Sequence, residues 1–503
     1  MAAICVIWWL AGGGVLLITA AGETNRWAGK PFDNEKESDM RNLTKMLAFG
    51  GVILAIFLMT IVRSNAAPGA AQPPKTTITP KITATLPFPT KTPRFVPSLP
   101  TGKRPPQCTF PLAQTTMAES TPEKYTFSEP KIVLTAEATI GLVEWLPDNQ
   151  WVLITQDFRG NTLQNIELFN PRTGILQLYA KRNKIDQSPI WVNRLNAVLY
   201  QDIKVLKVNK NNGTDRPSVE FRRQLWISRG DPQNAQLIED AFLTGNFLSY
   251  FSVGIEPEGE QIIYYTHNDQ RLSKRNGTFE IQQSIYLDIS QWEYRLMGSG
   301  MPIFYKMAWR PNSSQVFLYS LGEAGGYTFL LDTDTGQICE INLGNTGSEN
   351  AWADMARWSP DGKYLAVIRT WGSRPVDSSD LAVLDTTTGK LYIVRIVPST
   401  VEGLYFVNDV AWAPDSYHLA AIAQVLVQDP TLHTYYKISH LYLVDFLSNQ
   451  IIQISSPSNE QLGSGLGSTN LIWSSNGSQL LVKCPTTQVD RLCLLSVQRA
   501  AQK

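Results

Sequence analysis

The chain has 503 residues, of which 17% are charged and 43% are hydrophobic, and its formal net charge is zero. This composition excludes a disordered polyampholyte, and the length leaves room for more than one domain. Residues 108–503 hold 32 Lys and Arg against 39 Asp and Glu, and this acidic balance argues against a general nucleic-acid binder.

Two apolar segments, 1–22 and 46–62, begin the chain. If both span a membrane, the basic residues between them place that loop in the cytoplasm and the rest of the chain outside. In the other interpretation, Met40 is the true start, and residues 46–62 are the apolar part of a signal peptide that is cleaved near Ala66 or kept as an anchor. Both interpretations predict a cell-membrane or secreted protein with its main body on the extracytoplasmic side.

A proline- and threonine-rich segment follows. Residues 68–107 contain eleven prolines and eight threonines, a composition that cannot bury a core and favours extended polyproline conformations. It is either a spacer or a flexible linker. We therefore divide the chain into a membrane-anchor or signal region (1–66), a linker (67–123), a folded body (124–498) and a polar tail (499–503).

The body consists of repeats. Ten-residue segments that share a Trp anchor, with Ile255 in its place once, align without gaps. Each copy then runs through a Pro-Asp-Gly type of turn into an apolar strand. The structural repeat residues are Trp145, Trp191, Trp309, Trp358, Trp412 and Trp473, with Pro147, Pro257, Pro311, Pro360 and Pro414 in the turns. The tryptophans are expected to fill the wedges between neighbouring repeats.

A second turn follows about thirty residues after three of the anchors, at 170–174, 332–336 and 385–389. It adds a third and a fourth strand to each repeat. Four strands that recur every 46 to 64 residues are typical of a propeller blade. The fold class is therefore predicted as all-β, a seven-bladed β-propeller, with six or eight blades as the alternatives.

The W-x-P-D-G-K pattern, clearest at 358–367 and 412–421, resembles the WD40-like repeat of TolB-like β-propellers. The same repeat occurs in the propeller of prolyl-oligopeptidase-like peptidases. Such a peptidase also needs a hydrolase domain with Gly-x-Ser-x-Gly and a late His, and neither is present. The resemblance implies a propeller that binds a protein of the cell envelope.

No catalytic motif is found, so the sequence predicts a non-catalytic binding or scaffolding module rather than an enzyme. The alternative is an envelope enzyme that acts on glycans or sugars through the central mouth of the ring. The four histidines lack metal-ligand spacing, and no Cys-x-x-Cys pair is present. Without these patterns we expect neither a metal nor a cofactor.

The binding face is predicted at the ends of the blades that carry the long and dissimilar loops 202–223, 266–283 and 424–438, because recognition usually resides on loops held by a rigid scaffold. Two of these loops are basic, and aromatic residues add contact area, which favours an acidic protein partner. The alternative is that these are ordinary solvated hairpins. The candidate binding residues are Lys204, Lys207, Lys210, Arg222, Arg223, Arg271, Lys274, Arg275, Trp371, Tyr435 and Tyr436.

The two ends of the body are predicted to meet. The last repeat, after Trp473, has room for strands at about 479–484 and 491–497 but lacks its outermost strand. Residues 131–135 are expected to supply it, because this pairing hides two sheet edges. Cys484 and Cys493 bracket the turn between those last strands, so they form a disulfide or remain two buried thiols.

Overall fold

The computed structural model describes residues 94–95, 105–112, 123–158, 162–183, 188–209, 218–245, 252–255, 262–266, 271–275, 281–286, 306–319, 328–346, 349–350, 352–371, 378–396, 405–428, 435–455, 470–484 and 489–501. Contacts divide the chain into residues 1–86 and 87–503, and all described residues lie in the second unit. The apolar segments 1–22 and 46–62 lie outside the described residues. Within the described part of the chain, no helix is long and apolar enough to cross a membrane.

Six antiparallel sheets are each built from four strands that follow one another along the chain. The first three are β4 (Thr139–Trp145), β5 (Val152–Asp157), β6 (Leu163–Phe169) and β7 (Leu176–Asn183); β8 (Ile190–Val192), β9 (Ala197–Asn209), β10 (Ser218–Ser228) and β11 (Gln236–Gly245); and β12 (Ser252–Ile255), β13 (Ile262–Thr266), β14 (Arg271–Arg275) and β15 (Ile281–Tyr286). The next three are β16 (Lys306–Trp309), β17 (Gln315–Tyr319), β18 (Thr328–Asp332) and β19 (Ile338–Glu340); β22 (Trp352–Trp358), β23 (Tyr364–Trp371), β24 (Ser378–Asp385) and β25 (Leu391–Val394); and β26 (Tyr405–Trp412), β27 (His418–Gln428), β28 (Tyr435–Asp445) and β29 (Gln450–Ser455).

A further sheet joins the two ends of the folded body. It combines β30 (Leu471–Trp473), β31 (Gln479–Lys483) and β32 (Asp490–Ala501) with β2 (Glu123–Phe127) and β3 (Lys131–Ala136). The repeat anchored by Trp473 is thus completed by strands that precede the first blade, as expected for residues 131–135. The sequence placed the last strand at 491–497, but β32 continues to Ala501 because β2 also pairs with it.

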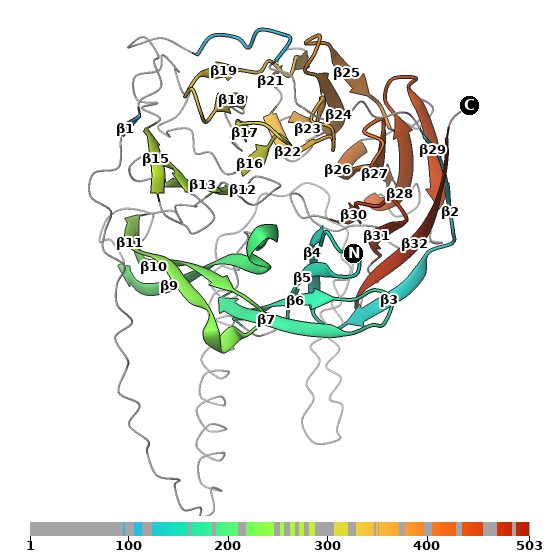
Figure 1. Ribbon diagram of the computed structural model, residues 1–503. Coiled ribbons are helices and arrows are strands. Elements are labelled where there is room, and N and C mark those ends of the chain that lie inside the picture. Colours follow the sequence, from blue (N-terminus) through green and yellow to red (C-terminus); the bar gives the residue numbers. More distant parts are fainter. Residues whose placement is uncertain are drawn as a thin grey trace, which may run out of the picture. The chain divides into compact units, whose positions relative to one another are not determined.

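Within residues 87–503 the sheets follow one another around a ring (Figure 1). The first strands of neighbouring sheets contact each other at β12 and β16, β16 and β22, β22 and β26, β26 and β30, and β30 and β4. These strands are the inner strands of the propeller. The prediction of an all-β β-propeller is confirmed. The predicted count of seven blades is corrected to six built from consecutive strands, which was one of the alternatives, because the repeat anchored by Trp473 forms the sheet that joins the chain ends.

The described residues also contain small elements outside these blades. These are the short helices η1 (Asn193–Leu195) and η2 (Pro232–Asn234), the hairpin of β20 (Asn345–Thr346) and β21 (Glu349–Asn350), and β1 (Arg94–Phe95), which pairs in parallel with β15.

The repeat residues hold neighbouring sheets together. All six anchor tryptophans are buried. Three of them donate their indole N–H to a backbone oxygen of the neighbouring inner strand: Trp145 to Ile472, Trp358 to Ala308 and Trp412 to Arg357, at 2.9 to 3.3 Å. Each ring therefore both fills apolar space and ties one blade to the next.

The turn after each anchor follows from its sequence. In the fifth blade, Oδ1 of Asp361 accepts the backbone N–H of Lys363, and Gly362 has a φ of 69°. The residues at the same turn position in three other blades, Asn149, Ser416 and Gly477, also have positive φ. The left-handed conformation is what this turn requires, and it explains why Gly, Asn or Ser stands there.

The end of the predicted linker packs against the propeller. Cys108 forms a disulfide with Cys339 of β19. The backbone N–H of Cys108 donates to Glu340 O at 2.9 Å, and the N–H of Leu112 donates to Thr386 O at 2.9 Å. Leu112 is buried in the cluster between the fourth and fifth blades. Residues 105–112 therefore form a strap over two blades rather than free linker.

Candidate functional site

The described residues of the predicted recognition loops lie on strands. Residues 202–209 and 218–223 belong to β9 and β10, β14 occupies 271–275 within the second insertion, and β27 and β28 cover most of the third. In the first and third insertions the strands are long: β9 has 13 residues, and β10, β27 and β28 have 11 each. In these described residues the backbone groups are satisfied by strand pairing, and the recognition role predicted for the insertions stays a prediction.

The basic candidates of the second blade differ in environment. Lys204 and Lys207 are exposed on β9. Nε of Arg222 donates to Asp240 at 2.8 Å, so this charge is paired within the sheet. Arg223 is buried, and burial lowers its pKa to about 8. Lys210 lies outside the described residues.

The other candidates lie on different blades. Trp371 ends β23 and Tyr435 and Tyr436 begin β28, so all three are at the hairpin ends between second and third strands. Arg271, Lys274 and Arg275 lie on β14 in the third blade. Arg275 pairs with Ile262 at the start of β13, which places it at the opposite end of that blade. The predicted set is therefore not brought together in one site.

Four charged residues on the inner strands form a cluster that sequence reasoning missed. They are Glu144 on β4, Lys306 on β16, Arg357 on β22 and Asp409 on β26. Nη2 of Arg357 lies 3.2 Å from Oδ1 of Asp409. The charge of Arg357 also acts on Glu144 and on Lys306. We call these four residues the inner-strand cluster.

Backbone groups hold both carboxylates in place. Oε1 of Glu144 accepts the N–H of Trp191 from the next blade at 2.7 Å. Asp409 accepts the N–H of Val410 at 2.8 Å, that of Leu471 at 3.0 Å and that of Asn470. Because the Trp191, Asn470 and Leu471 donors come from neighbouring sheets, the ring itself helps to position the acidic groups.

Burial shifts the pKa values of three residues in the cluster. Burial raises the pKa of Glu144 to about 7, although the Trp191 N–H and the Arg357 charge act in the opposite direction. Burial also raises the pKa of Asp409 against the effects of Arg357 and three backbone donors. Lys306 donates to Asp354 O at 2.8 Å, and burial lowers its pKa. A carboxyl group with a pKa near 7 suits general acid or base chemistry at neutral pH.

A weak signal of this cluster exists in the sequence. Glu144 and Arg357 stand one residue before an anchor Trp, while Lys306 and Asp409 stand three residues before one. Positions one and three before the anchor share a strand face when the pairing is regular. The charged residues at these two positions of the inner strands could have been picked out from the sequence. Only the closed ring shows that their side chains lie near one another.

The comparisons with known proteins found similar solved structures. No family model and no curated protein match this chain. The oligogalacturonate lyase of Vibrio parahaemolyticus is 14% identical over 76% of this chain and 98% of its own, with a TM-score of 0.46. An oligogalacturonate lyase in complex with manganese is 13% identical over 76% and 99%, with a TM-score of 0.45. The β-propeller domain of Cps50 (Swd1) from Myceliophteria thermophila is 12% identical over 75% and 100%, with a TM-score of 0.42.

These structures include enzymes, and prolyl endopeptidases also share the propeller at 11% identity and a TM-score of 0.38. The expectation of a non-catalytic scaffolding module that is not an enzyme is therefore corrected. That expectation rested on the lack of a hydrolase domain, but enzymes also occur among the similar propellers. At these identities and TM-scores the likeness assigns no role to this chain; the strands and sheets of the structure establish the fold. The chain is a β-propeller protein.

Proposed function

We propose that this protein is an enzyme that acts on glycans or sugars and that its active site is the inner-strand cluster. The observation that carries the proposal is the arrangement of Glu144, with a pKa of about 7, beside the charge of Arg357, which also pairs with the buried Asp409. Two carboxylates and a cation in one place are what acid–base chemistry on a saccharide requires.

Each residue has a proposed role. Glu144 moves the proton, because its carboxyl group exchanges protons near neutral pH. Arg357 and Lys306 stabilise negative charge on the substrate or on the developing transition state. Asp409 is a positioning residue, since its carboxylate accepts three backbone N–H groups and fixes the guanidinium of Arg357.

The proposal is tested with the full chain and a panel of acidic and neutral polysaccharides. New reducing ends and unsaturated products are both measured, so that hydrolysis and elimination are distinguished. Glu144→Gln should lower kcat by at least about a hundredfold. The thermal transition should not fall, because the Gln carbonyl still accepts the Trp191 N–H.

Glu167→Gln is the matched control. Glu167 is a Glu of the third strand β6 whose pKa is also raised by burial, but it is not on an inner strand. This variant should keep full activity. If wild type and Glu144→Gln are equally active on every polymer that is cleaved, the assignment of Glu144 is contradicted. If wild type cleaves none of the polymers, the proposed function is contradicted.

We also propose that the propeller lies on the extracytoplasmic side of the cell membrane. The Cys108–Cys339 and Cys484–Cys493 disulfides support this location, because such bonds persist in oxidising compartments. A reporter fused at the C-terminus should be active only outside the cytoplasm. Activity confined to the cytoplasm would refute the location without touching the enzymatic proposal.

A further inference from the structure

The hairpin of β9 and β10 carries an exposed apolar tip. Five consecutive residues, 204–208, are all exposed. Val205 is 53% exposed, Leu206 46% and Val208 54%. We call residues 204–208 the hairpin tip. Large aliphatic side chains that are exposed next to one another mark interaction surfaces more often than scattered single ones do.

The pairing of β9 explains this exposure. Its inner neighbour β8 pairs only with Ala197 to Leu199. Beyond Leu199, among the described residues, β9 pairs only with β10, and a register shift inserts Leu206 as an extra residue. At the tip, β10 also pairs with β11, so β9 is the open edge strand of a three-stranded sheet. An open apolar edge invites association unless something covers it or charges protect it.

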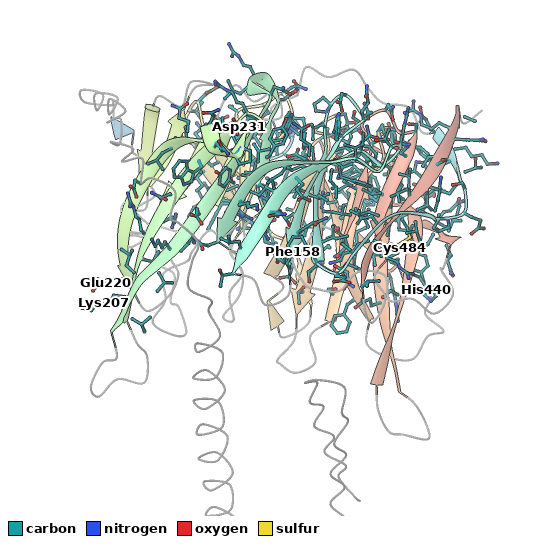
Figure 2. All side chains as sticks on the ribbon, turned by 90° about the horizontal axis from the view of Figure 1, so that it is seen from below. Phe158, Lys207, Glu220, Asp231, His440 and Cys484 are labelled. Atoms are coloured by element: carbon teal, nitrogen blue, oxygen red, sulfur yellow. A yellow bond between two sulfur atoms is a disulfide. The ribbon has the colours of Figure 1, made fainter. Side chains whose placement is uncertain are left out.

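The neighbouring blade adds apolar surface at the same end. Phe158, which follows β5, and Leu163, which begins β6, are also exposed. Figure 2 shows Phe158, Lys207 and Glu220 toward one end of the blades and Asp231 toward the other. Strands β7 and β9 of these two blades are in contact. The apolar residues thus belong to one side of the ring rather than to separate places.

We propose that the hairpin tip inserts into the surface of an anionic phospholipid membrane. All five tip residues are exposed, so both faces of this edge strand are open, and the interfacial region of a bilayer can contact both faces at once. Lys204 and Lys207 interrupt the aliphatic residues, and long lysine side chains reach lipid phosphates while Val205, Leu206 and Val208 enter the acyl boundary. Glu220 lies opposite Lys207 and offsets part of its positive charge. Apolar contact therefore supplies much of the attachment.

The test measures hydrogen–deuterium exchange of the full chain, with and without vesicles of phosphatidylglycerol mixed with phosphatidylcholine. Exchange of backbone amides in 203–209 should slow by about tenfold with anionic vesicles and much less with phosphatidylcholine alone. The readout is local, so it reports the tip whether or not another segment holds the chain at the membrane. This proposal does not depend on the enzymatic one.

Three variants separate the contributions. The triple change Val205→Ser, Leu206→Ser and Val208→Ser should abolish the slowing. Lys204→Glu with Lys207→Glu should reduce it strongly and remove its sensitivity to salt. Ile393→Ser with Ile452→Ser is the matched control, because these isoleucines are 49% and 58% exposed on the strands β25 and β29; it should leave the slowing unchanged.

Two results would overturn the proposal. One is unchanged exchange of 203–209 with anionic vesicles. The other is slowing that appears only when envelope proteins are added and is the same without lipid, which would assign the tip to a protein partner.

Discussion

At the residue scale, charges placed in inner strands are costly unless the ring supplies partners for them. A buried carboxylate without partners prefers to be neutral. Asp409 pairs with Arg357 and accepts three backbone N–H groups, whereas Glu144 accepts the N–H of Trp191. Burial raises the pKa of both carboxyl groups, and the arginine and backbone donors of Asp409 make it the group that holds the cluster in place.

The raised pKa of Glu144 predicts a pH dependence of stability. Its pKa is 4.5 ordinarily and about 7 in the fold. The folded state therefore binds the proton more tightly, and the resulting stability is present in full below pH 4.5 and lost as pH rises through 7. Relative to Glu144→Gln, the free energy of unfolding of the wild type should fall by roughly 1–3 kcal/mol across this window. Denaturant unfolding at several pH values measures it, and parallel curves for the two proteins would contradict the shift.

At the element scale, short covalent and hydrogen-bonded links fasten segments that have little core of their own. The strap 105–112 is joined to β19 by one disulfide and to Thr386 by a backbone hydrogen bond. The other disulfide closes the hairpin of β31 and β32. The two bonds thus act on loops of very different length.

The two disulfides should contribute unequally to stability. Cys108 and Cys339 are 231 residues apart and Cys484 and Cys493 are 9 apart. Because loop-closure entropy grows with the logarithm of loop length, Cys108→Ser with Cys339→Ser should cost about 3 kcal/mol more than Cys484→Ser with Cys493→Ser. Chemical denaturation of both double variants gives the difference. Equal losses would show that the strap contributes nothing beyond its local contacts.

At the scale of the whole molecule, the propeller depends on the sheet that joins both chain ends. Strands β2 and β3 pair with β32, and Tyr125 of β2 packs against Trp473 with the ring centroids 5.2 Å apart. Closure removes the exposed edges that a ring cut open would present. Damage to β2 should therefore loosen the whole ring.

Tyr125→Ala should lower the free energy of unfolding by roughly 3–5 kcal/mol, because it empties a buried aromatic site at the closure. Lys124→Ala, on the exposed face of the same strand, is the control and should change it by less than about 0.5 kcal/mol. Deletion of residues 125–136 should be more damaging than either. A thermal transition of the deletion variant equal to that of wild type would refute closure by strand exchange.

Local patterns in the sequence were enough to predict strands, turns and blades. The anchor tryptophans, the Pro-Asp-Gly turns and the apolar runs are local features, and each blade closes mostly on its own residues. Ring closure by residues 131–135 was also predictable, since the last repeat lacked a strand. The length of β9 and β10 was not, because polar and basic residues in a long hairpin look like a loop unless their pairing is known.

The sequence by itself determined the all-β propeller, because short-range turn chemistry and strand alternation repeat along the chain. Only the tertiary structure decided which charged side chains meet. Glu144 and Asp409 are 265 positions apart in the numbering and stand in separate repeats, and Cys108 and Cys339 are 231 positions apart. Closing the ring brings such residues together, and no pattern of neighbouring residues in the sequence predicts which distant residues will meet.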